Sequence, residues 1–362
     1  MGVITALAIL AGLIVVHEAG HFFAATWQGI RVSGFSVGFG PVLLERQRRG
    51  VQFALRAIPL GGFVSFPDDD EESSIPSDDP DLLSNRPLHQ RALVIAAGVL
   101  ANLLLAWTVL LAQGALVGIP AGFSATPGVL VSGVQQGQAA AASGLRAGDR
   151  ILAVNGQDLG GGQSAVGQLV QLVKAAPDQK LSLSTERMGN SLELTLTPAD
   201  LGGVGRIGAQ LQPSGVEVFR RPHSPLEVIR QTNRQFSSLT RRTVDGFVTL
   251  VTHFGETASQ VSGPVKIVEM GASLAKQGGS SLFLYTALIS INLAVLNALP
   301  LPMLDGGQFM LLLLEGVRRK PLPERFQMAF MQSGFVLLVG LSVVLIVKDT
   351  SQLSAVQQLL SR

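Results

Sequence analysis

His17-Glu18-Ala19-Gly20-His21 lies inside the stretch Met1 to Trp27, in which no other residue carries a charged side chain. In a helix, residues four positions apart share one face, so His17 and His21 can bind the same metal ion. Glu18 can then serve as general base toward a water molecule at that metal. The stretch is long and apolar enough to cross a bilayer. Because ionisable groups in such a span are costly, they indicate a functional site.

This motif has two other interpretations. A match of this length also arises by chance, with both histidines packed or solvated on an ordinary helix. Between Val3 and Ala24, however, the stretch has no polar face that could solvate them. A secretory signal peptide is disfavoured because no basic region precedes the apolar run and because Glu18 interrupts its middle.

The composition of the chain excludes several classes of protein. Of its 362 residues, 47% are hydrophobic and only 14% are charged. The mean hydropathy is +0.39, and the apolar residues are concentrated in blocks, as in a membrane protein. A net charge of +2 without a basic, aromatic-rich patch argues against nucleic acid as a partner. The absence of cysteine excludes disulfides and cysteine-ligated metal, leaving histidine and carboxylate ligands.

Four apolar segments predict a polytopic α-helical membrane protein with four transmembrane helices. The predicted spans are residues 1–27, 91–117, 282–316 and 328–348. Arginine and lysine are concentrated in the connections 28–90 and 317–327, which the positive-inside rule places in the cytoplasm. The opposite, extracytoplasmic side then contains both termini, with the tail 349–362, and the long segment 118–281.

The first connection contains a predicted membrane-associated β-hairpin region, residues 28–66. Gly34–Pro41 and Val51–Phe66 show short alternating apolar runs, and Gln47–Gly50 supplies a polar turn between them. The hairpin is either an amphipathic surface feature or a strand edge near the metal helix that pairs with an unwound substrate.

Residues 67–90 form a predicted acidic cytoplasmic linker, in which Asp68–Glu72 and Asp78–Asp79 alternate with serine and proline. This composition is typical of a flexible, solvated segment, and no site is assigned to it. The isolated residues His89, His223 and His253 have no partner at ligand spacing and are interpreted as surface or structural histidines.

The segment 118–213 has the pattern of a small α+β module. A predicted strand at Gly128–Val134 and a short helix at Ala139–Gly144 precede the run GLRAGDRILAVNG at 144–156. This run resembles the PDZ domain of bacterial proteases, which implies a groove that receives a peptide by strand addition; the alternative is a spacer domain. Residues 214–281 follow as a predicted amphipathic connector along the outer membrane surface.

A catalytic zinc site uses three protein ligands, so a third ligand is expected at membrane depth. Asp305 is the candidate, within Asn297–Gly307 of the third predicted span. Pro300 and Pro302 break the helix there, and irregular backbone at this depth is tolerated where it lines a cavity. Asn297 either holds a substrate backbone amide or makes an interhelical hydrogen bond.

HEAGHF at 17–22 and NALPLPMLDGG at 297–307 resemble the paired motifs of the site-2 protease family of intramembrane zinc metalloproteases. The resemblance covers the whole chain and is greatest to bacterial and plastid members with a single PDZ domain. It implies that His17, His21 and Asp305 bind Zn²⁺. It further implies that Glu18 is the catalytic glutamate and that Asn297 positions the substrate.

The resemblance also implies an activity: hydrolysis of peptide bonds within or near transmembrane helices, as in regulated intramembrane proteolysis. Expected substrates are single-span membrane proteins such as anti-sigma factors or signal-peptide remnants. The implied location is the bacterial inner membrane or the thylakoid membrane. Two rivals were a non-enzymatic membrane adaptor and a metal transporter. A transporter is expected to place carboxylates in several spans, whereas only Glu18 and Asp305 lie deep here.

Overall fold

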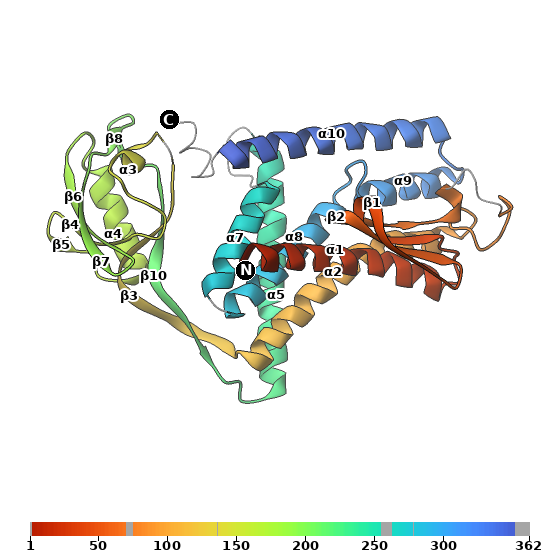
Figure 1. Ribbon diagram of the computed structural model, residues 1–362, viewed down its shortest axis with the longest axis horizontal. Coiled ribbons are helices and arrows are strands. Elements are labelled where there is room, and N and C mark those ends of the chain that lie inside the picture. The colour runs from red at the N-terminus through yellow and green to blue at the C-terminus, as the bar shows by residue number, and fades with distance from the viewer. Residues whose placement is uncertain (1, 70–74, 136, 255–262, 278, 352–362) are drawn as a thin grey trace. The chain divides into compact units, whose positions relative to one another are not determined.

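The computed structural model describes residues 2–69, 75–135, 137–254, 263–277 and 279–351, which form two compact units (Figure 1). One unit comprises Met1–Val117 and Pro222–Arg362, and the other is Gly118–Arg221. Four helices of the described chain are long and apolar enough to cross a membrane: Gly2–Trp27, Leu88–Leu116, Ser280–Ala298 and Arg325–Thr350. All four belong to the first unit, as the spans predicted from the sequence require.

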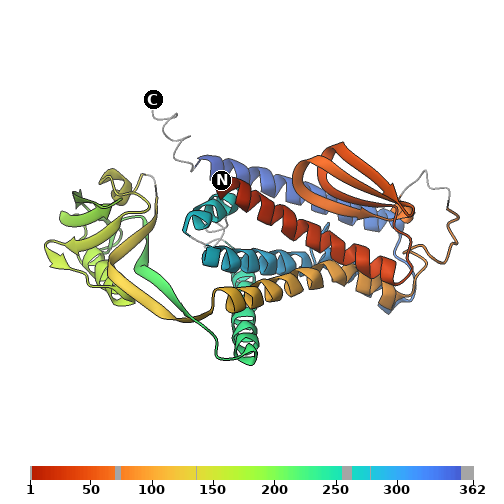
Figure 2. The same cartoon turned by 60° about the horizontal axis from the view of Figure 1, so that its bottom comes forward.

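The four apolar helices of the first unit have roughly aligned axes (Figure 2). They are α1 (Gly2–Trp27), α2 (Leu88–Leu116), α8 (Gly279–Ala298) and α10 (Glu324–Ser351). Small residues allow α1 and α2 to approach closely: a Cβ added at Gly20 would lie 2.4 Å from the carbonyl oxygen of Ala97. This close approach brings the histidine face of α1 against α2.

The third predicted span, 282–316, consists of two helices. The first helix, α8, ends at Ala298, and α9 (Asp305–Arg318) begins after a six-residue break at 299–304. Pro300 and Pro302 account for the break because neither can donate a backbone hydrogen bond. A Cβ at Gly307 would lie 2.1 Å from the Leu301 carbonyl oxygen, so the turn into α9 needs glycine. With 14 residues, α9 is too short to cross a bilayer by itself.

The structure has the predicted hairpin with its turn at the expected place, but both strands of the hairpin also bend. Strands β1 (Gly34–Arg48) and β2 (Val51–Ser65) pair next to a turn at Arg49 and Gly50, both with positive φ. Both strands bend, so Gly34–Val37 pairs with Gln52–Leu55 on one side and with Gly62–Ser65 on the other.

Glycines allow this bending, since Gly38 has φ +89 and Gly61 has φ +118. Within the described residues, no further strand pairs with the segment Gly62–Ser65. That segment is therefore an edge of the small sheet, and β2 packs against α1.

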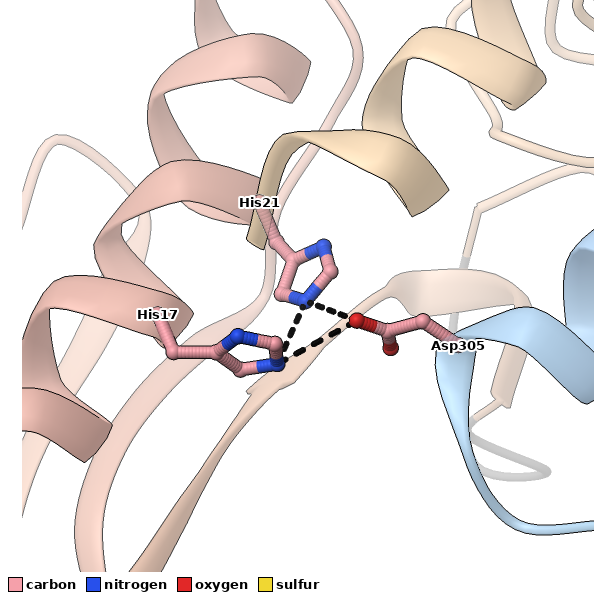
Figure 3. A group of neighbouring side chains, drawn as sticks. All are labelled: His17, His21 and Asp305. Atoms are coloured by element: carbon pink, nitrogen blue, oxygen red, sulfur yellow. Dashed lines mark hydrogen bonds and ion pairs between the residues drawn. The ribbon is translucent and has the colours of Figure 1, made fainter. Parts of the chain in front are cut away.

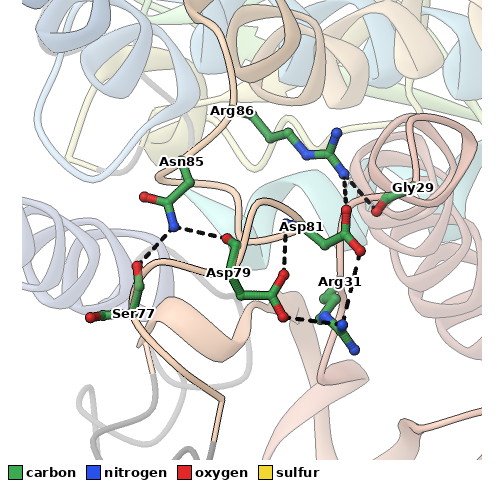
Figure 4. Close-up of polar contacts among 7 residues, drawn as sticks. All are labelled: Gly29, Arg31, Ser77, Asp79, Asp81, Asn85 and Arg86. Carbon is green, nitrogen blue, oxygen red and sulfur yellow. Dashed lines mark hydrogen bonds and ion pairs between the residues drawn. The ribbon is translucent and has the colours of Figure 1, made fainter.

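The described part of the acidic linker is held in place (Figure 4). Arg31 Nη2 lies 3.1 Å from Asp79 Oδ2, and Arg86 Nη2 lies 2.6 Å from Asp81 Oδ1. Arg86 also donates a 2.9 Å hydrogen bond to the Gly29 carbonyl oxygen. This part is therefore not the freely solvated chain that its composition predicts, because Arg31 of the preceding segment and Arg86 of the linker itself pair with its carboxylates. Residues 70–74, which include most of the Asp68–Glu72 run, lie outside the described residues.

The predicted connector 214–281 contains parts of both units. Its first residues belong to strand β10 (Ala209–Arg220) of the second unit. In its described residues, α5 (Pro225–Thr252) and α7 (Pro264–Gln277) follow in the first unit. Trp107 Nε1 of α2 donates a 2.7 Å hydrogen bond to Asn233 Oδ1 of α5, so α5 is tied to a predicted span. Residues 255–262 and 278 of the connector, and 352–362 of the tail, lie outside the described residues.

The second unit is built on a six-stranded sheet in the order β10-β3-β4-β6-β7, with β5 paired to β4. Its elements are β3 (Ile119–Val134), α3 (Ala139–Ala142), β4 (Arg150–Val154), β5 (Gln157–Asp158), α4 (Gly162–Lys174), β6 (Leu181–Arg187), β7 (Asn190–Leu196) and the short pair β8 (Ala199–Asp200) and β9 (Gly205–Arg206). Val129, Ile151 and Leu183 of the sheet and Leu169 of α4 form its buried core. Helix α4 packs against β3 and the edge strand β10.

A buried ion pair stabilises this unit. Asp149 is fully buried, and its carboxylate accepts hydrogen bonds of 2.6 and 2.7 Å from Arg187 and of 2.8 Å from the Arg146 backbone N–H. Burial alone would raise the pKa of Asp149, but these hydrogen bonds outweigh it and hold the pKa below its usual value. The carboxylate is therefore ionised in the folded state.

We expect Asp149→Ala to lower the free energy of unfolding of this unit by about 1.5–3 kcal/mol, because Arg187 and the Arg146 backbone N–H lose their charged hydrogen-bond acceptor. In the wild type, the contribution of Asp149 is complete above its unfolded pKa of about 3.9 and is lost as pH falls through the lower folded pKa. Hydrogen exchange of the β4 and β6 amides in the full chain measures both effects. The matched control is Glu186→Gln, which removes the partly exposed pair with Arg150 and is expected to cost at most about 1 kcal/mol. Equal effects of the two substitutions would contradict the role of burial.

Candidate metal centre

The structure brings His17, His21 and Asp305 together (Figure 3). The two histidines project from one face of α1, and Asp305 is the first residue of α9. His17 Nε2 lies 3.3 Å from His21 Nε2. Asp305 Oδ2 lies 3.2 Å from His17 Nε2 and 3.5 Å from His21 Nε2. Three ligand atoms, from two helices far apart in the sequence, therefore form a near-equilateral triangle.

The spacing of this triangle fits a tetrahedral metal ion. Zinc binds nitrogen and oxygen ligands at about 2.0–2.2 Å, which separates neighbouring tetrahedral ligands by about 3.4 Å. The Asp305 Oδ2 atom is buried and accepts no hydrogen bond of good geometry from the described residues. A buried carboxylate oxygen between two imidazole nitrogens suits a divalent cation, because it otherwise lacks compensation for its desolvation. Among the described residues, this is the one group of three histidine or acidic side chains close enough to share a metal.

Helix α2 contacts the far side of both imidazole rings. His21 Nδ1 lies 2.8 Å from the Val94 carbonyl oxygen, and His17 Nδ1 lies 3.2 Å from the Asn102 side-chain amide. Between these contacts, a Cβ added at Gly98 would come within 2.3 Å of His21 Nε2. No role of α2 at the metal centre is predicted from the sequence. The signal that could have indicated one is Asn102, which together with Gln113 interrupts the apolar run of this span.

Glu18 lines a cavity of about 480 Å³ together with the three candidate ligands. Strand β2 contributes Gly61–Val64 to the same cavity, and the break before α9 contributes Met303 and Leu304. The approach of β2 to the glutamate is close: a Cβ added at Gly62 would lie 3.0 Å from Glu18 Cγ. Glu18 therefore faces an open space that is bounded by the metal triangle and by the edge strand of the small sheet.

Asn297 lies near the C-terminal end of α8, where its Nδ2 atom is 3.4 Å from His17 Nε2, and it also lines the cavity. The geometry is compatible with both interpretations of this residue, a substrate contact and an interhelical hydrogen bond. The isolated histidines stay outside the group; His253, for example, has its Nδ1 atom 2.9 Å from Thr252 Oγ1.

Comparison with known proteins agrees with this geometry. Residues 5–341 match the model of peptidase family M50. The chain belongs to peptidase family M50. Since the match covers both candidate motifs and includes most of each of the four apolar helices, the protein is a membrane metalloprotease of this family. This finding disfavours the adaptor and the transporter.

The chain is similar over its whole length to cyanobacterial and plant members of the family. It is 49% identical to a candidate zinc metalloprotease of Nostoc sp., over 98% of this chain and 97% of the relative. It is 44% identical to the chloroplast membrane metalloprotease ARASP of Arabidopsis thaliana, over 99% of this chain and 80% of the relative. It is 46% identical to a candidate zinc metalloprotease of Synechocystis sp., over 99% of this chain and 97% of the relative. The two cyanobacterial relatives are named as zinc metalloproteases, and the plant relative is named as a membrane metalloprotease.

Proposed function

We propose that the protein is a zinc-dependent intramembrane endopeptidase that cleaves single-span membrane proteins within or near their transmembrane helices. One observation carries the proposal: the triangle of His17, His21 and Asp305 and the cavity-facing Glu18 lie on or beside helices apolar enough to cross a bilayer. A site at that depth suits substrates that are themselves in the membrane.

In this proposal His17, His21 and Asp305 would hold Zn²⁺, and the cavity that they line leaves room for water and substrate beside them. When bound, zinc supplies Lewis-acid polarisation of the scissile carbonyl and of the attacking water. Glu18 accepts the proton of that water and transfers it to the leaving amine. Asn297, beside His17 and in the cavity wall, donates a hydrogen bond to the backbone of the substrate.

The edge segment Gly62–Ser65 is suited to hold an unwound substrate. A helical substrate hides its amides in internal hydrogen bonds, so the scissile region must lose those bonds before hydrolysis. An edge strand offers unpaired backbone N–H and C=O groups that replace them. Gly62–Val64 lines the cavity next to Glu18, which places the donors and acceptors where the unwound chain is needed.

The second unit, Gly118–Arg221, is proposed to be a PDZ domain on the extracytoplasmic side. The support is its sequence run at 144–156 and its topology, in which β10 is an edge strand next to α4. Such an edge accepts a peptide by strand addition. The domain would bind or exclude the outer part of a substrate, such as a shortened anti-sigma factor or a signal-peptide remnant. The proposed location is a bacterial inner membrane or a thylakoid membrane.

The proposal can be tested in liposomes that contain the full-length protein. The substrate is a designed single-span polypeptide with a short outer tail, and its cleavage is measured. We expect hydrolysis at a bond within or next to the apolar span, its loss with a zinc chelator, and its recovery with added Zn²⁺. Mass spectrometry of the products locates the bond. Cleavage confined to the soluble tail, or cleavage that is indifferent to the chelator, would contradict the proposal.

A further inference from the structure

Helix α2 presents one stripe of residues to the metal triangle. Val94, Gly98 and Asn102 are spaced four residues apart, so they share one face of α2, and all three are buried. The Val94 carbonyl oxygen contacts His21, Gly98 lies under both rings, and Asn102 contacts His17. Each candidate histidine ligand therefore has an α2 group against its Nδ1 atom.

The contact to His17 decides which ring nitrogen carries the proton. A metal can bind Nε2 of a neutral imidazole only when the proton is on Nδ1, which then needs a hydrogen-bond acceptor. The Val94 carbonyl oxygen is such an acceptor for His21, at 2.8 Å. For His17, the atom at the corresponding place is the Asn102 amide nitrogen, 3.2 Å from Nδ1. The other end of that amide, Asn102 Oδ1, is buried and has no hydrogen-bond partner among the described residues.

Rotation of the Asn102 amide by half a turn exchanges its oxygen and nitrogen. The two orientations have nearly the same shape, so the hydrogen-bond requirement selects between them. With the oxygen toward His17, Nδ1–H donates to Oδ1, and the Nε2 lone pair faces Asp305 and His21. With the nitrogen toward His17, Nδ1 accepts and the proton moves to Nε2, which prevents metal binding there.

We propose that Asn102 is a positioning residue that holds the His17 imidazole in its metal-binding tautomer and orientation. Asn102 is fully buried. Its backbone carbonyl oxygen accepts a 2.7 Å hydrogen bond from Ser290 Oγ of α8. That bond fixes the backbone from which the amide projects. In either orientation one polar end of the amide has no partner among the described residues, a cost that an apolar residue would avoid. The inference rests on the proposed role of His17 as a ligand.

The test compares zinc affinity and apo-protein melting temperature for wild type, Asn102→Leu and Asn102→Asp in the full-length, detergent-solubilised protein. Competition with a chromophoric chelator measures the affinity. Loss of a group that orients a metal ligand typically weakens binding about 10–100-fold, and we expect this loss for N102L. A carboxylate also accepts from Nδ1–H, so N102D should stay within roughly threefold of wild type. The apo melting temperature of N102L should not fall, since the unpaired amide is gone.

Gln113→Leu is the matched control, because Gln113 is another buried α2 residue whose side-chain oxygen has no partner within the described part of the chain. Unlike Asn102, Gln113 makes no hydrogen bond to a candidate ligand in that part of the chain. It should leave zinc affinity unchanged. Equal affinity of N102L and wild type, or equal losses for N102L and N102D, would overturn the positioning role. If N102L does not fold, N102S replaces it, since a serine hydroxyl is too short to reach His17 and should lose affinity as N102L would. A wild type that binds no zinc would instead refute the proposed function itself.

Discussion

Glu18→Gln is expected to lower the turnover of a designed single-span substrate by about a hundred- to ten-thousand-fold, the usual contribution of a general base. Glutamine has almost the same shape as glutamate but cannot accept the proton of the attacking water. The metal triangle does not include Glu18, so zinc should remain bound at the wild-type level. Cleavage in liposomes and elemental analysis of the purified protein measure the two quantities on the same preparation.

Glu45→Gln is the control for this substitution, because Glu45 lies exposed on β1 and outside the cavity. It makes the same chemical change in the same unit and should leave turnover unchanged. Cleavage by the Glu18 variant at the wild-type rate would remove the residue from catalysis. Loss of zinc from that variant would instead show that Glu18 acts on the metal site and not on the proton.

Asp305→Ala is expected to reduce bound zinc from about one ion per chain to a small fraction of that, because a catalytic site retains few ions with two protein ligands. The loss of affinity should exceed the 10–100-fold that loss of an outer contact typically costs. Zinc content after purification, followed by titration with a competing chelator, measures this effect. Activity should fall in parallel and recover only in part at high zinc concentration.

Asp245→Ala provides the comparison, since Asp245 is an exposed aspartate of α5 in the same unit. Its zinc content should equal that of the wild type. Unchanged zinc in the Asp305 variant would show that another group completes the site. A loss of zinc in both variants would indicate a general defect in folding rather than removal of a ligand.

Local patterns in the sequence were sufficient for the parts of the site that one helix or one turn builds. The four-residue spacing of His17 and His21 implies a shared face because every α-helix has this periodicity. Proline at 300 and 302 predicts the break that α8 and α9 show. The turn of the hairpin lies at Arg49 and Gly50, within the predicted polar segment. Each of these features depends on neighbours in the chain.

Features that depend on distant parts of the chain could not be predicted in this way. The described acidic linker is ordered because Arg31 and Arg86 happen to face its carboxylates. The edge Gly62–Ser65 exists because both hairpin strands bend, which the alternating pattern of apolar residues does not show. A hairpin pattern specifies which faces are apolar, but not how the strands curl or what lies beside them.

The sequence alone is sufficient to predict four segments apolar enough to cross a membrane, and to find two histidines, a glutamate and an aspartate within them, because composition and helical periodicity are local properties. The triangle that Asp305 completes, with sides near 3.3 Å, and its support by α2 are evident from the folded structure and not from the sequence. The α2 contacts join residues 73 and 85 positions apart. Their distances follow from how closely α1, α2 and α9 pack, and small residues such as Gly20 and Gly98 set that closeness.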